Sequence, residues 1–215
     1  MSRDTDTLHG NAPDACEVAL LLIDVINDMD FPEGDQLLAH ALPMAERLAA
    51  LKENARRANV PVIYANDNFG RWRSDFRVQV EYCTRPESRG RPVAEKLRPG
   101  ETDYFVLKPK HSAFYHTTLE LLLKHLGTRT VVCTGIAGNI CVLFTASDAY
   151  LRDLKVAVPA DCVASNTEAE SRGALQLMEK LLKADVRPSG QWTFEELLER
   201  KKQPARSVSE GKRQS

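Results

Sequence analysis

Three side chains that could do acid, base and nucleophile chemistry follow three of the apolar runs in the chain. Asp24 ends VALLLID, Lys108 ends YFVLK, and Cys141 comes one short loop after TVVCTG. If these runs are parallel strands, their carboxyl ends meet at one edge of a sheet, where open α/β sheets hold their ligands. A thiol at a helix N-terminus and near a cation is stabilised as the thiolate that attacks carbonyl groups. The pattern therefore makes Cys141 a candidate nucleophile, with Lys108 as a candidate cation and Asp24 as a candidate group to take and return its proton.

The elements that must position these residues alternate along the chain. Apolar, largely β-branched or leucine-rich runs predict strands at residues 18–24, 60–66, 104–108, 130–135 and 155–159, and a sixth near 185–187. Continuous apolar strands separated by helices are typical of a parallel sheet that is covered on both faces. We therefore expect an α/β fold: a single-domain, Rossmann-like three-layer sandwich with a mainly parallel sheet of about six strands and helices on both faces.

Amphipathic patterns predict the helices, at residues 43–58, 119–126, 167–183 and 194–202. Pro43 is tolerable in a first helical turn, where its missing N–H leaves no bond unmade. Two capping boxes are predicted, from Thr117 to Glu120 and from Thr167 to Glu170. Gly127 should end the second of these helices.

Length and composition indicate one domain, residues 17–202, between polar tails at residues 1–16 and 203–215. A chain of 215 residues is long enough to sustain a single core. Its formal net charge is −1, with acidic and basic residues interspersed, which favours no nucleic-acid partner. No apolar stretch approaches the roughly 20 residues of a membrane span, and the start of the chain lacks the apolar core of a signal peptide. We therefore expect a cytoplasmic protein that acts on a small molecule, without a membrane partner.

The five cysteines show neither close pairs nor CxxC spacing. Their odd number and spacing indicate free thiols rather than a disulfide framework or a zinc site. Most free cysteines are small buried side chains, and we expect this of four of them: Cys16, Cys83, Cys133 and Cys162.

The segments LLIDVINDMDF, KPKHSAF and GIAGNICVLFTASDA together resemble the isochorismatase-like cysteine hydrolase superfamily, which includes nicotinamidases, N-carbamoylsarcosine amidohydrolases and ureidoacrylate amidohydrolases. They stand in the family's order. The resemblance implies that Cys141 is the nucleophile, Asp24 the general acid/base, and Lys108 the cation that lowers the thiol pKa. It also implies a cis peptide bond between Ile136 and Ala137, and an oxyanion hole formed by the amides of Ala137 and Cys141.

The function implied by the resemblance is hydrolysis of a C–N bond in a small amide, ureide or carbamoyl compound. The reaction would pass through a thioester and need no cofactor. Family members commonly form dimers and larger assemblies, so the resemblance also implies a homo-oligomer.

The chain departs from the family's pattern at two positions. Gly138 stands where threonine or serine is usual, and Ile26 stands where glutamine is usual; we expect both changes to alter the pocket wall. The stretch 66–76 lacks the histidines of metal-containing nicotinamidases, so no metal is expected. Its amide and aromatic side chains suit a specificity loop. Together with nearby motif residues they form the predicted substrate-binding set, which is Phe31, Asp67, Asn68, Phe69, Trp72 and His111.

Other interpretations remain open for several of these residues. Asp24 could cap the loop that follows it, although Asn27 and Asp28 suit that role better. Lys110 competes with Lys108 as the cation. Phe69 and Trp72 could instead cover the core.

Three other functions are also compatible with parts of the pattern. Some relatives hydrolyse a vinyl ether without using the cysteine. The GIAG turn could hold a nucleotide phosphate, although the GxGxxG spacing is missing. A catalytically silent relative could act through protein contacts.

Overall fold

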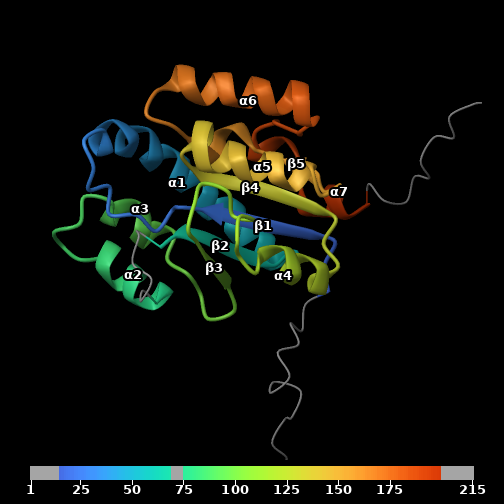
Figure 1. Cartoon of the computed structure of the whole chain (residues 1–215), viewed down its shortest axis with the longest axis horizontal. Helices are drawn as coiled ribbons and strands as arrows, with labels where there is room; N and C mark the ends of the chain where they lie inside the picture. Colours follow the sequence, from blue (N-terminus) through green and yellow to red (C-terminus); the bar gives the residue numbers. More distant parts are fainter. Residues whose placement is uncertain (1–14, 69–74, 200–215) are drawn as a thin grey trace, which may run out of the picture.

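The fold is built on a parallel sheet of six strands. The structure, a computed structural model, describes residues 15–68 and 75–199. Figure 1 shows the sheet at the centre of the molecule. Its strand order is β3-β2-β1-β4-β5, and β6 pairs with β4. The strands are β1 (Val18–Ile23), β2 (Val62–Asp67), β3 (Tyr104–Lys108), β4 (Thr130–Ile136), β5 (Lys155–Ala157) and β6 (Val163–Ala164). The predicted α/β class and the strand count of about six are confirmed.

Helices cover both faces of the sheet, as the three-layer prediction requires (Figure 1). Alternate residues of β1 point to opposite faces, so Leu20 and Leu22 join one apolar core while Leu21 and Ile23 join the other. The first core is covered by α1 (Gly34–Arg57), α2 (Phe76–Cys83), α3 (Arg91–Lys96) and α7 (Phe194–Glu199). The second core is covered by α4 (Leu119–Leu126), α5 (Leu143–Tyr150) and α6 (Glu168–Leu182).

Two predicted elements differ in the structure: the first helix begins earlier than predicted, and the sixth strand lies at another place in the chain. The first helix begins at Gly34 rather than at residue 43, so Pro43 lies inside it. A proline removes one helical hydrogen bond, but the helix continues because one face stays buried through this region, as Ala41 and Met44 show. The stretch 185–187 forms only a bridge between Asp185 and Ala157. The sixth strand is instead the two-residue β6, which is too short for a sequence pattern to indicate.

One of the two predicted capping boxes is present. The Thr167 side chain accepts from the Glu170 amide, and the Glu170 carboxylate accepts from the Thr167 amide. Only half of the other box is present: Thr117 Oγ1 accepts from the Leu119 amide at 3.1 Å, but the Glu120 carboxylate binds Lys124 and Arg152 instead of its helix N-terminus. The stop at Gly127 is confirmed by its left-handed backbone, with φ 72°. The predicted tails fall mainly on residues 1–14 and 200–215, which lie outside the described residues.

Gly135 illustrates how closely β4 passes β1 at the carboxyl ends of the two strands. Its φ of 109° and the 2.1 Å that would separate an added Cβ from the Ile23 carbonyl oxygen leave no room for a side chain. We expect Gly135→Ala to lower the free energy of unfolding by about 3 kcal/mol or more, from strain and overpacking. Urea denaturation followed by circular dichroism measures this. Gly173→Ala is the control, because it lies within α6 with open space around it and should stabilise slightly. Equal effects of the two substitutions would contradict the prediction.

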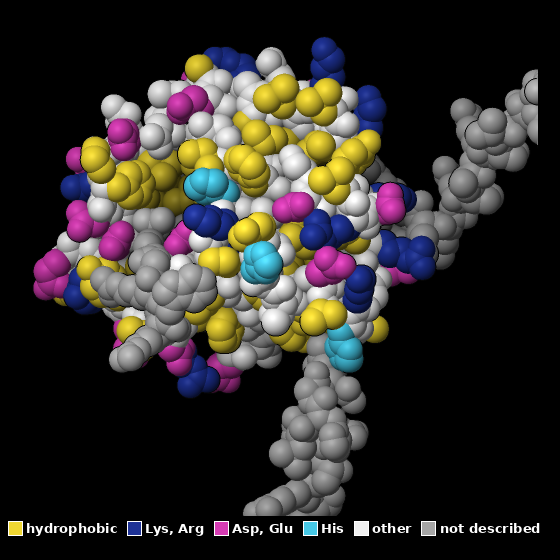
Figure 2. Space-filling model, viewed as in Figure 1, with side chains coloured by type: hydrophobic (Ala, Val, Ile, Leu, Met, Phe, Trp, Pro, Cys, Tyr) yellow, Lys and Arg dark blue, Asp and Glu magenta, His cyan; other side chains and the backbone are white. Residues whose placement is uncertain are grey.

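The surface view in Figure 2 shows hydrophobic side chains gathered over α5 and α6. Those with large exposed areas are Phe144, Tyr150, Leu151, Leu177 and Leu181. Among the described helices, none is both long enough and apolar enough to span a membrane.

Candidate active site

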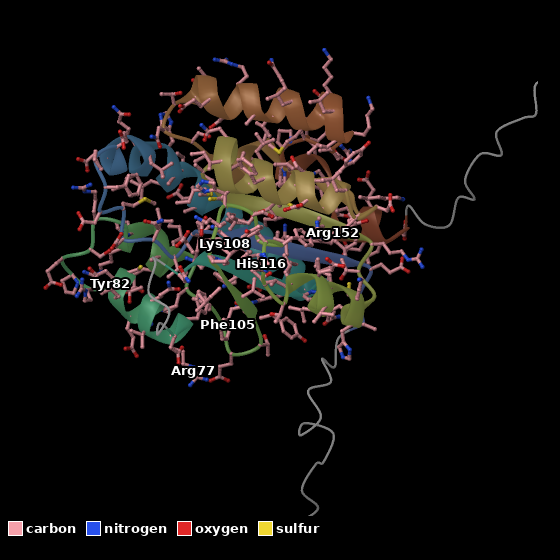
Figure 3. All side chains as sticks on the ribbon, viewed as in Figure 1. Arg77, Tyr82, Phe105, Lys108, His116 and Arg152 are labelled. Atoms are coloured by element: carbon pink, nitrogen blue, oxygen red, sulfur yellow. The ribbon has the colours of Figure 1, made fainter. Side chains whose placement is uncertain are left out.

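The ends of three strands bring the acid, the amine and the thiol together. Strand order places β1 between β2 and β4, with β3 beyond β2, so the residues that follow these strands meet at one edge. Lys108 Nζ lies 2.7 Å from Asp24 Oδ2 and 3.6 Å from Cys141 Sγ. Asp24 is also close enough to the Cys141 thiol for its charge to raise the pKa of that thiol. Lys108 lies near the centre of the view in Figure 3, at the end of β3. Lys110, the other candidate for the cation, is exposed. Its backbone carbonyl accepts from Lys108 Nζ at 3.2 Å.

Asp24 is fixed by backbone contacts rather than acting as a loop cap. Its amide donates to the Ala65 carbonyl, and its Oδ1 accepts from the Asp67 amide at 2.7 Å. The backbone turns out of β1 here, with φ 53° at Asp24. The capping contacts of this loop come instead from Asn27 and Asp28, whose side chains accept from backbone amides two residues on.

Asn66 is a positioning residue that sequence reasoning missed. It is fully buried, its Nδ2 donates to the Ile26 carbonyl at 2.7 Å, and its Oδ1 accepts from the Ile26 amide at 3.4 Å. Asn66, near the end of β2, therefore clamps the turn that carries Asp24. The only signal in the sequence is a polar residue at the end of an apolar strand.

Burial decides the resting state of the thiol. Burial, with the charge of Asp24, raises the pKa of Cys141 to about 12, although Lys108 acts in the opposite direction. Lys108 does lower the thiol pKa, as expected. The pKa is nevertheless raised overall, because burial and the charge of Asp24 outweigh the effect of Lys108. Cys141 therefore rests as a thiol.

The two charged partners of the thiol differ in what burial does to them. Burial raises the pKa of Asp24 above its ordinary value, although the charge of Lys108 opposes this. Burial lowers the pKa of Lys108, but Asp24, Cys141 and Asp67 outweigh it and raise that pKa above its ordinary value. Lys108 is thus a permanent ammonium, and Asp24 is a carboxylate that accepts a proton more readily than an exposed one.

The loop before Cys141 contains the cis peptide bond that the resemblance implied. The peptide bond between Ile136 and Ala137 is cis, and Cys141 lies in a π-helical turn, η2 (Gly138–Val142), that leads into α5. A Cβ added to Gly138 would lie 3.1 Å from the Ser165 hydroxyl oxygen and against β6. That hydroxyl accepts from the amide of Asn139. A side chain at position 138 would therefore be directed at β6.

The predicted substrate-binding residues are only partly brought together. Asp67 Oδ2 lies 3.8 Å from Lys108 Nζ, and the Asn68 amide donates to the Lys108 carbonyl. His111 Nδ1 lies 3.7 Å from Cys141 Sγ. Phe31 packs, partly buried, against the core on the α1 side. Phe69 and Trp72 lie outside the described residues.

The loop after Lys108 is fastened to α5, which the sequence did not indicate. The Ser112 hydroxyl bonds to the Asp148 carboxylate, and the Ala113 amide donates to Thr145 Oγ1 at 3.0 Å. Asp148 in turn pairs with Arg152. Cys141 and this loop are therefore positioned by the same helix.

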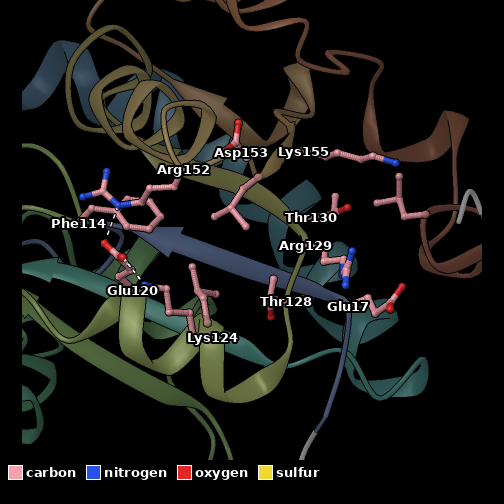
Figure 4. A pocket seen from close by; sticks show the side chains of 13 residues that line it. Glu17, Phe114, Glu120, Lys124, Thr128, Arg129, Thr130, Arg152, Asp153 and Lys155 are labelled. Carbon is pink, nitrogen blue, oxygen red and sulfur yellow. Dashed lines mark hydrogen bonds and ion pairs between the residues drawn. The ribbon is translucent and has the colours of Figure 1, made fainter. Parts of the chain in front are cut away.

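Arg152 continues this network away from the thiol. Figure 4 shows Glu120 joined to both Arg152 and Lys124, on the wall of a hollow of about 540 Å³ between α4 and the residues after α5. The guanidinium of Arg152 also lies 4.7 Å from the centre of the Phe114 ring. Among the residues that the structure describes, no group of three or more His, Cys, Asp or Glu side chains could hold a metal ion.

Comparison with known proteins identifies relatives over most of the chain. A family model described as the isochorismatase domain matches residues 18–188. The isochorismatase family protein YaaI of Bacillus subtilis is 44% identical over 168 residues, which is 78% of this chain and 92% of that protein. The phenazine biosynthesis protein PhzD1 of Pseudomonas aeruginosa is 31% identical over 67% of this chain and 78% of its own length.

A solved structure has the same fold. The crystal structure of N-carbamoylsarcosine amidase from Thermoplasma acidophilum has a TM-score of 0.62 and 26% sequence identity, and the match covers 81% of this chain and 97% of that chain. The fold and the order of the elements are therefore shared with an amidase.

Proposed function

The chain belongs to the isochorismatase family of hydrolases, and we propose that within this family it is a cysteine-dependent amidohydrolase. Its substrate is a small amide, ureide or carbamoyl compound, and the reaction passes through a thioester. The observation that carries the proposal is the contact of one thiol with both a buried carboxylate and a buried ammonium, Cys141 with Asp24 and Lys108.

In the first half-reaction Cys141 is the nucleophile, Lys108 stabilises negative charge, and Asp24 first accepts a proton and then donates it. Asp24 takes the Cys141 proton as the sulfur attacks the carbonyl carbon, which avoids a resting thiolate. Lys108 stabilises the negative charge that moves from the carboxylate to the sulfur and on to the carbonyl oxygen. The amides of Ala137 and Cys141 receive that oxygen, and Asp24 gives its proton to the departing nitrogen. An acyl thioester remains on Cys141.

The second half-reaction releases the acyl group to water and restores the thiol. No cofactor takes part in this cycle. Substrate contacts are assigned to Asp67, Asn68 and His111 around the nucleophile, and to Phe31 at the loop after β1. The specificity loop, with Phe69 and Trp72, belongs to the same proposal.

The family resemblance also supports a homo-oligomer in the cytoplasm. Light scattering coupled to size exclusion gives the mass of the assembly directly. A mass of one chain at micromolar concentration would contradict this part of the proposal.

A screen of amides, ureides and carbamoyl compounds for release of ammonia or amine tests the proposed reaction. Each active compound is then mixed with the enzyme, quenched and examined by mass spectrometry for an acyl group on Cys141. Turnover with an adduct on that cysteine is the expected result. Turnover of a vinyl ether, with none of any amide or ureide, would favour the alternative reaction. No turnover of either class would favour the silent relative.

The raised pKa of Cys141 predicts slow alkylation near neutral pH. We expect the rate of labelling by iodoacetamide to rise with pH through the alkaline range, because only the thiolate reacts. Asp24→Asn should speed labelling at a fixed alkaline pH, since the charge of Asp24 and its hydrogen bond both raise the thiol pKa. Peptide mass spectrometry after timed labelling measures both rates. Labelling of Cys16 in the same samples is the control and should not respond to Asp24→Asn. A rate at pH 7 that is already maximal would contradict the prediction.

A further inference from the structure

The contact between Lys108 and Cys141 joins two elements that are not neighbours in the sheet. Lys108 ends β3 and Cys141 follows β4, while β2 and β1 lie between those two strands. Adjacent strands are about 4.8 Å apart, so about three such spacings separate β3 from β4. The Lys108 ammonium nevertheless lies 3.6 Å from Cys141 Sγ. The sheet alone does not fix this contact, because the lysine side chain is long and flexible.

The loop after β3, residues 109–118, is bound to α5, the helix that follows the nucleophile. The Ser112 hydroxyl donates to the Asp148 carboxylate, and the Ala113 amide donates to Thr145 Oγ1 at 3.0 Å. Ser112 is 6% exposed and Thr145 is fully buried, so water competes little for these bonds. The Ser112 bond is the stronger of the two, because its acceptor is charged.

The near end of this loop contacts the ammonium itself. The Lys110 carbonyl accepts from Lys108 Nζ at 3.2 Å. Ser112 comes only two residues later, so a shift of the loop at Ser112 also moves this carbonyl. Together with the Asp24 carboxylate, at 2.7 Å, the carbonyl sets where the ammonium lies.

Asp148 is held by a second group besides Ser112. Arg152 Nη1 donates to the Asp148 carboxylate at 3.0 Å, from one turn further along the chain. Arg152 also binds Glu120 of α4 at 2.8 Å, and its guanidinium lies over the Phe114 ring of the loop (Figure 4). The carboxylate that receives the Ser112 hydroxyl is therefore fixed in its own position.

We propose that Ser112 and Asp148 are positioning residues, whose hydrogen bond holds the loop on α5 and so keeps Lys108 at its distance from Cys141. This rests on the proposed thioester mechanism, in which Lys108 stabilises the charge that forms as the sulfur attacks. Such stabilisation depends on distance, and a displacement of about 1 Å can cost about 100-fold in rate. Loss of the hydrogen bond therefore slows the chemistry and leaves substrate affinity unchanged.

Rapid mixing with p-nitrophenyl acetate measures the chemical step. Attack by Cys141 releases p-nitrophenolate in a burst, and the burst rate at rising ester concentration gives a limiting rate and a half-saturation concentration. We expect Ser112→Ala and Asp148→Ala to lower the limiting rate about 10- to 100-fold, with an unchanged half-saturation concentration. Ser112→Thr keeps the hydroxyl and should keep most of the rate. The double variant should be no slower than Asp148→Ala, because both residues act through one bond.

Alkylation of Cys141 reports on the same contact without any substrate. Lys108 lowers the pKa of this thiol, so a displaced ammonium leaves less thiolate at a given pH. Labelling by iodoacetamide at a fixed alkaline pH should be about threefold or more slower in Ser112→Ala, because only the thiolate reacts. A general loosening of the structure predicts the opposite, since it would expose the sulfur to the reagent and to water.

Ser147→Ala is the matched control, because Ser147 lies next to Asp148 but its hydroxyl donates within its own helix, to the Leu143 carbonyl. It should keep both rates, and circular dichroism checks that each variant is folded. Should Asp148→Ala fail to fold, Ser112→Ala decides on its own.

Two results for Ser112→Ala would overturn the proposal. One is a labelling rate that is unchanged or faster. The other is an unchanged limiting burst rate, whether or not the half-saturation concentration rises. Failure of the thioester mechanism itself looks different: the unaltered enzyme would then show no burst, while labelling of Cys141 would still slow in Ser112→Ala.

Discussion

Cys141→Ala is expected to lower turnover of an amide or ureide substrate by on the order of 10⁵-fold. Removing the nucleophile of a covalent mechanism leaves only substrate binding and the oxyanion site, and losses of this size follow. The buried Asp24 and Lys108 keep each other as partners, at 2.7 Å, so the fold should persist. Initial rates of amine release, with circular dichroism to check folding, measure the effect.

Cys16→Ala is the control for this substitution. Cys16 is also a free, half-buried thiol, but it lies before β1, at the opposite end of that strand from Asp24. Its loss should leave turnover within about twofold of the unaltered enzyme, because surface and edge substitutions seldom reach a distant site. Hydrolysis of a vinyl ether would not need the thiol. Turnover that survives Cys141→Ala would therefore exclude the thioester mechanism and favour that alternative.

The positions of the three central residues could be predicted because each depends on one strand and one rule. Asp24 and Lys108 follow directly on apolar runs, and Cys141 follows a run after a glycine-containing loop. Parallel strands align their carboxyl ends, and the observed order places β1, β2, β3 and β4 side by side. The local sequence was therefore enough to predict that these three residues lie at one edge of the sheet.

The residues that hold these groups in place could not be predicted, because their partners are far away in the chain. Asn66 clamps the turn at Ile26, 40 residues earlier, and Ser112 binds Asp148, 36 residues later. Nothing in the sequence near either residue identifies such a partner. Glu120 failed as a capping residue for the same reason, because Arg152 approaches it from the end of α5.

The two departures from the family's pattern have a different meaning once their surroundings are known. Ile26 is fully buried in the core on the α1 side, and Gly138 lies against Ser165 and β6. Both positions thus act on the packing beneath the loops that carry Asp24 and Cys141. Neither position contacts the sulfur of Cys141. The exposed side chain next to that sulfur is His111, whose Nδ1 lies 3.7 Å from it.

In the proposed mechanism, the charges around the thiol explain why Asp24 accepts the thiol proton during the attack. Asp24, Asp67 and a thiolate would place three negative charges around the single ammonium of Lys108. Burial makes this arrangement costly, and it raises the pKa of Cys141 to about 12. Moving the proton to Asp24 as the carbon–sulfur bond forms avoids that state. In the proposed mechanism the carboxylate therefore contributes more to catalysis than the cation does.

Asp24→Asn tests whether this carboxylate transfers the protons. We expect it to lower kcat by about 10³-fold or more, since an amide can neither accept the thiol proton nor pass one to the leaving nitrogen. The unaltered enzyme should lose activity as pH falls through the pKa of Asp24. Burial raises that pKa, so the acidic limb of kcat/KM should lie above the ordinary carboxyl value of about 4.

Kinetics of amine release across pH measure both features, and Asp28→Asn is the matched control. Asp28 lies in the same loop, but its side chain accepts only from the amide of Asp30 among the bonds described. That variant should keep both the rate and the acidic limb. In Asp24→Asn the residual activity should lose the limb, because the group that titrates is gone. A limb that persists unchanged in Asp24→Asn would assign the proton transfer to another group and leave Asp24 only the role of holding Lys108.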